Sequence, residues 1–161
     1  MNRVRVHRIN HEYLQTSIIR STKLDFKNAA IAIATDDGTT VSSHFGHARF
    51  YEILNFSDGK VIKRERREKA GHHSFAPTES EHDHHSGEAS EHRHQTMVSP
   101  VLDCQAVIVR GMGQGAVEHL RRSNLTPVLT ELHTIEEVIG AIATGSLTSD
   151  ARRIHQHHGQ H

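Results

Sequence analysis

Cysteine is almost absent from the chain, since its 161 residues include only Cys104. One cysteine excludes an intramolecular disulfide, and it cannot alone supply the four thiolates that usually hold an iron–sulfur cluster. Excess charge of either sign is also absent, because 19 basic residues balance 19 acidic ones. The sequence therefore gives nucleic-acid binding no electrostatic support. A reducing cytosol is the expected compartment.

Long apolar runs are missing as well. No run approaches the length that spans a membrane, and residues 1–28 lack the continuous apolar stretch of a signal peptide. Hydrophobic residues make up 35% of the chain, which is low for a compact fold. We attribute much of this deficit to a polar insertion and a polar tail. The expected organisation is an extension of uncertain structure over 1–28, one domain over 29–150 and a His-rich tail over 151–161.

Histidine is abundant, with 17 residues in all and seven between positions 71 and 95. This segment is otherwise Gly, Ser and acidic residues, so it cannot bury enough surface to offset its ordering entropy. We predict a mobile loop over 71–95. Imidazole and carboxylate together favour Zn, Ni, Cu or Co. The alternative is a linker with incidental histidines. The candidate metal ligands are His72, His73, His82, His84, His85, His92 and His94.

Apolar patterning outside this segment predicts one α/β domain. A turn signal at Asp58-Gly59 joins two of the expected strands into a hairpin, and Pro127 places the last strand at an edge. Pro100 limits any helix near 97–102 to a short or kinked one. The strands are expected at 29–34, 49–56, 60–67, 106–109 and 126–130, and the main helices at 115–123 and 135–144. Alternating strands and helices indicate a mixed five-stranded sheet with helices packed on it.

The second of these helices has the clearest boundaries. Thr134 and Glu137 form a capping-box pattern at its start, and Gly145 is suited to end it. Strands 29–34 and 106–109 are expected to be parallel, so the residues that follow each of them should emerge at the same edge of the sheet. A binding site is expected at that edge.

Three motifs together resemble the NifX/NifB-type dinitrogenase iron–molybdenum cofactor biosynthesis family. The first is the run from Ile31 to Gly38 followed by Val41-Ser42-Ser43-His44-Phe45-Gly46-His47-Ala48-Arg49-Phe50. The second runs from Asp103-Cys104 through Arg110-Gly111-Met112-Gly113-Gln114-Gly115-Ala116, and the third from Thr130 through Glu136-Glu137 to Gly145-Ser146-Leu147. The resemblance covers 29–155 without the insertion. It implies a ribonuclease H-like fold and a domain that binds or carries a metal cluster of iron–sulfur or iron–molybdenum type.

The resemblance implicates His44 in holding the cofactor. A loop histidine on a rigid strand framework is a plausible open ligand, although it could instead only hydrogen-bond within its loop. Cys104 could provide a thiolate, or it could be a buried apolar side chain. The backbone N–H groups of Gly111, Gly113 and Gly115 could bind an anion, or these glycines could serve close packing.

The leading hypothesis is a non-enzymatic cluster carrier, monomeric or weakly dimeric, that exchanges cargo with a donor or acceptor protein. Members of the family need not all serve nitrogenase. The alternative is a buffer or chaperone for divalent metal ions that acts through residues 71–95. A third hypothesis is a metal-dependent phosphodiesterase, which would need several converging carboxylates. Its candidates are Asp36, Asp37, Glu52 and Asp103.

Overall fold

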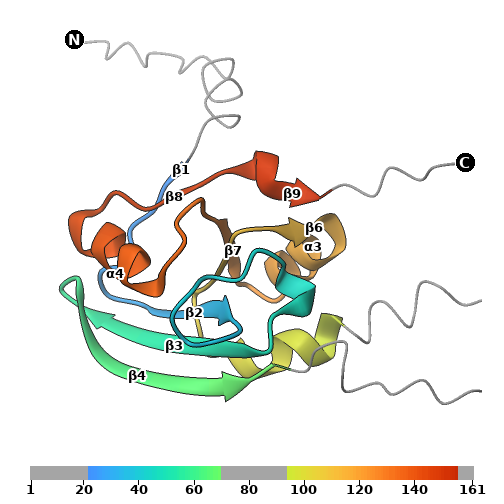
Figure 1. Ribbon diagram of the computed structural model, residues 1–161, viewed down its shortest axis with the longest axis horizontal. Coiled ribbons are helices and arrows are strands. Elements are labelled where there is room, and N and C mark those ends of the chain that lie inside the picture. Colours follow the sequence, from blue (N-terminus) through green and yellow to red (C-terminus); the bar gives the residue numbers. More distant parts are fainter. Residues whose placement is uncertain (1–21, 70–93, 156–161) are drawn as a thin grey trace, which may run out of the picture.

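The computed structural model describes residues 22–69 and 94–155, which form a five-stranded sheet with helices on both faces (Figure 1). The strand order is β4-β3-β2-β5-β7. β3 is antiparallel to both β2 and β4, whereas β2, β5 and β7 are parallel. The mixed five-stranded sheet is therefore confirmed. The strands are β2 Ala30–Thr35, β3 Phe50–Ser57, β4 Lys60–Glu68, β5 Ala106–Val109 and β7 Thr126–Leu129.

Side-chain alternation along the strands divides the core into two layers. Ala32 and Ala34 of β2 face α3 (Gln114–Arg122) and the helical segment 94–101, which ends in the 3-10 turn η3 (Ser99–Val101). Ile31 and Ile33 face α4 (Ile135–Thr144) on the opposite side. β2 is almost completely buried because both of its faces are covered.

Local signals placed the turns and the last helix correctly. The Thr134 hydroxyl accepts a hydrogen bond from the N–H of Glu137, whose carboxylate accepts one from the N–H of Thr134. Gly145 ends α4 at a φ of 69°. The β3–β4 hairpin turns through Asp58 and Gly59, both at positive φ. The capping box, the glycine stop and the hairpin are all confirmed.

Two small sheets extend the folded unit beyond the expected 29–150. β1 (Thr22–Lys23) pairs with β8 (Thr148–Ser149), and β6 (Met112–Gly113) pairs in parallel with β9 (Ile154–His155). Residues 22–28 and 151–155 therefore contribute to the domain. Strands of two residues carry no periodic pattern, so they could not be predicted from the sequence.

The expected mobile loop over 71–95 is only partly within the described residues. His94 and Gln95 are helical, so the loop prediction was wrong at its C-terminal end. The other part lies outside the described residues, together with His72, His73, His82, His84, His85 and His92. Within residues 22–69 and 94–155, no helix is long and apolar enough to cross a membrane.

Candidate functional site

The site begins where parallel strands β2 and β5 end at the same edge of the sheet. The chain that follows β2 turns back, and the N–H of Ser42 donates to the carbonyl of Ala34 at 2.8 Å. The two post-strand segments then bond to each other. The N–H of Arg110 donates to Ser42 O, and the N–H of Phe45 donates to Gly111 O, each at 2.9 Å. These bonds fix the 3-10 turn η1 (Phe45–His47) beside the loop after β5.

Gly111 is required by this close approach. A Cβ atom at this position would lie 2.6 Å from the backbone oxygen of Ser43 and 2.8 Å from Nε2 of His155. Both distances are shorter than van der Waals contact, and the first involves backbone that cannot rotate away. Close packing therefore explains why position 111 requires a glycine. Gly113 is the N-cap of α3, and Gly115 lies in the first turn of that helix, where a Cβ atom would come within 3.0 Å of the His94 ring.

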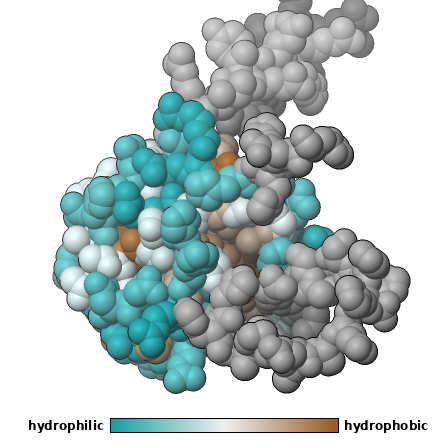
Figure 2. Space-filling view, turned by 45° about the vertical axis from the view of Figure 1, so that its right-hand side comes forward, coloured by the Kyte–Doolittle hydropathy of each residue, from teal (hydrophilic) through white to brown (hydrophobic). Residues whose placement is uncertain are grey.

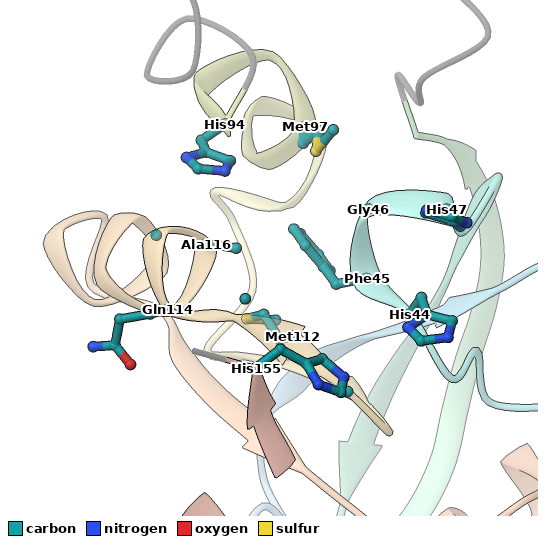
Figure 3. Close-up of a pocket in the computed structure, with 13 residues that line it drawn as sticks. His44, Phe45, Gly46, His47, His94, Met97, Met112, Gln114, Ala116 and His155 are labelled. Atoms are coloured by element: carbon teal, nitrogen blue, oxygen red, sulfur yellow. The ribbon is translucent and has the colours of Figure 1, made fainter. Parts of the chain in front are cut away.

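A pocket of about 570 Å³ lies between η1, the loop after β5 and the start of α3. Figure 3 shows side chains converging on it from four separate parts of the chain. The side of the molecule that carries α3 and β6 also shows an apolar area among hydrophilic residues (Figure 2). The pocket is lined by His44, Phe45, Gly46, His47, His94, Met97, Gly111, Met112, Gly113, Gln114, Gly115, Ala116 and His155.

Three imidazoles gather on one side of the pocket. The ring of His44 lies 5.5 Å from that of His47 and 5.8 Å from that of His155, measured between centroids. All three residues are exposed. Ser42 fixes the backbone at this point, because its hydroxyl bonds both the N–H and the carbonyl of His44. His44 is thus presented to solvent at a loop tip, as the sequence predicted.

Phe45 separates these rings from the fourth pocket histidine, His94 (Figure 3). Behind Phe45 lies Lys69, which is only 4% exposed. Its ammonium is 4.5 Å from the centroid of the Phe45 ring and 3.4 Å from the carbonyl of Ala48. Burial lowers the pKa of Lys69 to about 8, although Asp36 opposes this effect. A cationic group therefore supports the turn that carries His44.

His94 lies on the opposite side of the pocket (Figure 3), close to Gly115, where a Cβ atom would be 3.0 Å from its ring. Its ring centroid is 6.0 Å from that of His119 on α3. His94 is the one member of the predicted metal-binding set that falls within the described residues. The structure thus brings it to the same pocket as His44, which the sequence did not indicate.

Cys104 is not brought together with His44. It belongs to the core that faces α3, is 6% exposed and does not line the pocket. Burial, together with the neighbouring charge of Asp103, raises the pKa of its thiol to about 12. The thiol is consequently protonated at neutral pH, whereas a metal ligand must be a thiolate. Cys104 thus lies in the environment of a buried apolar side chain, which was one of the two alternatives considered for it.

The candidate carboxylates do not converge on a common point. Asp37 accepts hydrogen bonds from the N–H groups of Thr39 and Thr40, which lower its pKa to about 2. Asp36 accepts from the N–H of Arg49. Glu52 is bound by Arg64 and Arg66, and Asp103 is bound by Arg67. Each has a structural partner, so the arrangement expected for two-metal chemistry is not formed.

No group of three or more His, Cys, Asp or Glu side chains is arranged to hold a metal ion within the two described ranges. The pocket instead offers exposed imidazoles beside an apolar floor. Sequence reasoning missed His47 and covered His155 only as part of the His-rich tail over 151–161. The i, i+3 spacing of His44 and His47 was a usable signal, but the approach of His155 depends on the β6–β9 pairing.

The geometry defines a small α/β domain with a histidine-lined pocket at the ends of parallel strands. A family model described as dinitrogenase iron–molybdenum cofactor matches residues 27–145. The chain belongs to this family, as the motifs around His44 and Gly111 indicated. No curated protein gives a significant match.

Solved structures support the fold. A Methanocaldococcus jannaschii protein provisionally described as a dinitrogenase is 14% identical, with a TM-score of 0.53, over 77% of this chain and 96% of its own. A Thermotoga protein provisionally described as NifB is 23% identical, with a TM-score of 0.50, over 75% and 92%. The apo form of the orange protein from Desulfovibrio gigas is 13% identical, with a TM-score of 0.55, over 81% and 97%.

Proposed function

We propose that this protein is a non-enzymatic carrier that binds a preformed metal–sulfur cluster, of iron–sulfur or iron–molybdenum type, through His44. The observation that carries the proposal is the pocket of about 570 Å³ with the imidazole of His44 exposed at its edge. Membership of the iron–molybdenum cofactor family supports the class of cargo.

The ligand inventory suits a cargo that brings most of its own ligands. Internal sulfides satisfy most metal positions of an assembled cluster, so a carrier needs to provide only a few donors. Imidazole is a good ligand for iron and for other borderline metals. Cys104 is excluded from this role in the proposal because its buried thiol does not reach the pocket. A small number of ligands also permits release to an acceptor protein.

The pocket has other groups that could hold the inorganic part of the cargo. Gly113 and Gly115 lie at the N-terminal end of α3, where backbone N–H groups favour negative charge. Phe45, Met97 and Met112 provide an apolar wall that excludes water. The proposal therefore assigns His44 to the metal, and the backbone N–H groups at Gly113 and Gly115 to cluster sulfide or an anionic group of the cargo.

Anaerobic transfer experiments would test this function. The purified full chain should take up a preformed [4Fe–4S] cluster from a small-thiolate complex and retain it through gel filtration. His44→Ala should lose retention at least roughly tenfold, as expected when a metal ligand is removed. His133→Ala is the matched control, because His133 is also exposed but lies outside the pocket. Equal retention in the two variants would remove His44 from the site.

Divalent-ion binding remains a second candidate, and the position of His94 favours it. The rings of His94 and His119 lie 6.0 Å apart on adjacent helices. Two half-exposed imidazoles at this spacing suit Zn, Ni or Cu. Calorimetry with Zn²⁺ should show one fewer or weaker ion bound in His119→Ala than in the wild type. An unchanged titration would show that the pair of His94 and His119 does not bind the ion.

A further inference from the structure

We propose that His155 is a second nitrogen ligand, which binds the same metal atom as His44 and so closes a two-histidine clamp. This inference rests on the proposed function and deepens it, because it specifies how the cargo is held. Nothing in the motifs assigns His155 to the site. The argument comes from the strand that carries it, the state of the two rings and the space left by Gly111.

The position of His155 is built into the fold. Its strand β9 pairs in parallel with β6, so that Gly113 is opposite His155 and Met112 is opposite Ile154. Ile154 packs against the core that faces α3. Just before β9, the carboxylate of Asp150 caps the turn by accepting from the N–H of Arg152, and the N–H of Asp150 donates to Leu129 O at 2.9 Å. These contacts hold the chain against the edge of the pocket.

The two rings are adjacent and available. Their centroids are 5.8 Å apart, both residues are exposed, and in Figure 3 the rings lie side by side. Among the described residues, neither imidazole makes a hydrogen bond or an ion pair. Here the nitrogens of both rings remain available to a ligand.

His47 is also close to His44, but its proximity has a local cause. Residues at i and i+3 overlap along a 3-10 turn, and η1 follows directly after His44. The approach of His155 instead requires two segments more than a hundred residues apart to be fixed together. Gly111 makes this possible, because a Cβ atom there would come within 2.8 Å of Nε2 of His155.

The separation suits one shared metal atom. With metal–nitrogen bonds of about 2.0–2.1 Å at a tetrahedral angle, two ligating nitrogens lie roughly 3.4 Å apart and their ring centroids roughly 5 Å apart. The observed 5.8 Å would close by roughly 1 Å through side-chain rotation. Two neutral imidazoles select iron, cobalt, nickel, copper or zinc over the hard cations magnesium and calcium. The occupant is thus an exposed borderline metal atom that has two open coordination positions, such as one iron of a [2Fe–2S] cluster.

Pulsed electron paramagnetic resonance can count the nitrogens. The full chain would be loaded anaerobically with a preformed [2Fe–2S] cluster, in which one iron has two positions open to imidazole, and reduced to its paramagnetic state. We expect two strongly coupled imidazole nitrogens in the wild type and one in His155→Ala. Retention of the cluster should also fall by at least roughly tenfold in this variant. Circular dichroism would confirm that His155→Ala folds, as the exposure of His155 predicts.

The matched control is His47→Ala, which removes the other neighbour of His44 and should keep both nitrogens. The inference is overturned alone if His44→Ala loses the cluster while His155→Ala keeps two nitrogens and wild-type retention. It is also overturned if His47→Ala removes the second nitrogen. If the wild type binds no cluster, the proposed function and the clamp fall together.

Discussion

Gly111→Ala should damage the pocket more than any other single methyl group added there. The new Cβ atom would meet the backbone oxygen of Ser43 at 2.6 Å and Nε2 of His155 at 2.8 Å. The loop that carries His44 must then move away from β5. Two hydrogen bonds would be stretched by this movement, from Arg110 to Ser42 and from Phe45 to Gly111.

The expected loss of stability is moderate. Overpacking of a well-packed site costs about 1–3 kcal/mol. A Gly to Ala change also restricts the unfolded chain, which returns about 0.4–1 kcal/mol. The free energy of unfolding should therefore fall by up to roughly 2.6 kcal/mol. Cluster retention should fall by more than the lower stability alone would cause, because both His44 and His155 are displaced.

Urea unfolding followed by circular dichroism would measure the first effect, and anaerobic cluster retention the second. The matched control is Gly46→Ala, since Gly46 lines the same pocket and a Cβ atom there would meet nothing within 4 Å. The control should keep wild-type stability and retention. If Gly111→Ala behaves like Gly46→Ala in both assays, the close approach described here is wrong.

Three further predictions concern residues outside the clamp. Burial lowers the pKa of Lys69 from 10.5 in the unfolded chain to about 8 in the folded protein. Between pH 8 and pH 10.5 the Lys69 amine is therefore protonated in the unfolded chain but neutral in the folded protein, and the free energy of unfolding rises by roughly 3 kcal/mol across this range. Lys69→Met should therefore be more stable than the wild type at pH 7 by up to that amount, and urea titrations should show the difference shrinking toward pH 10.5; a difference independent of pH would contradict the cause given. Cys104→Ala should retain the cluster like the wild type, and the wild-type thiol, with its pKa near 12, should react with iodoacetamide at pH 8 roughly a thousandfold more slowly than free cysteine; rapid alkylation would show that the thiol is accessible. Thr134→Ala should lower the free energy of unfolding by about 0.5–2 kcal/mol by removing the capping box, and an unchanged urea midpoint would show that the cap contributes nothing.

Local signals explain how much of the fold could be predicted from the sequence. The strand Ala106–Val109 was expected at its observed bounds because four consecutive apolar residues are flanked by polar ones and glycine. The start of α4 was correct because the Thr134–Glu137 exchange involves residues three apart. In both cases the stabilising contacts, or the burial pattern, can be recognised within one short window.

The site was predictable where a local motif marked it, as for His44 and for Gly111, Gly113 and Gly115, which all line the pocket. His44 could be chosen from its motif and its position after a turn. The approach of His155 and His94 could not be predicted, since each is brought to the pocket by pairing or packing with residues distant in sequence. The alternatives for Cys104 also needed the structure, because the sequence does not show whether a lone cysteine beside a strand lies in the core.

Both edges of the main sheet are closed to further strands. β4 carries Lys63, Arg64, Arg66 and Arg67 along its length, and repeated charge discourages edge-to-edge pairing. On β7, Pro127 has no N–H to offer, while the N–H of Leu129 donates to the Ser149 hydroxyl and its carbonyl accepts from Asp150. Any docking of a second molecule should therefore use side-chain surfaces and leave the backbone of this sheet unextended.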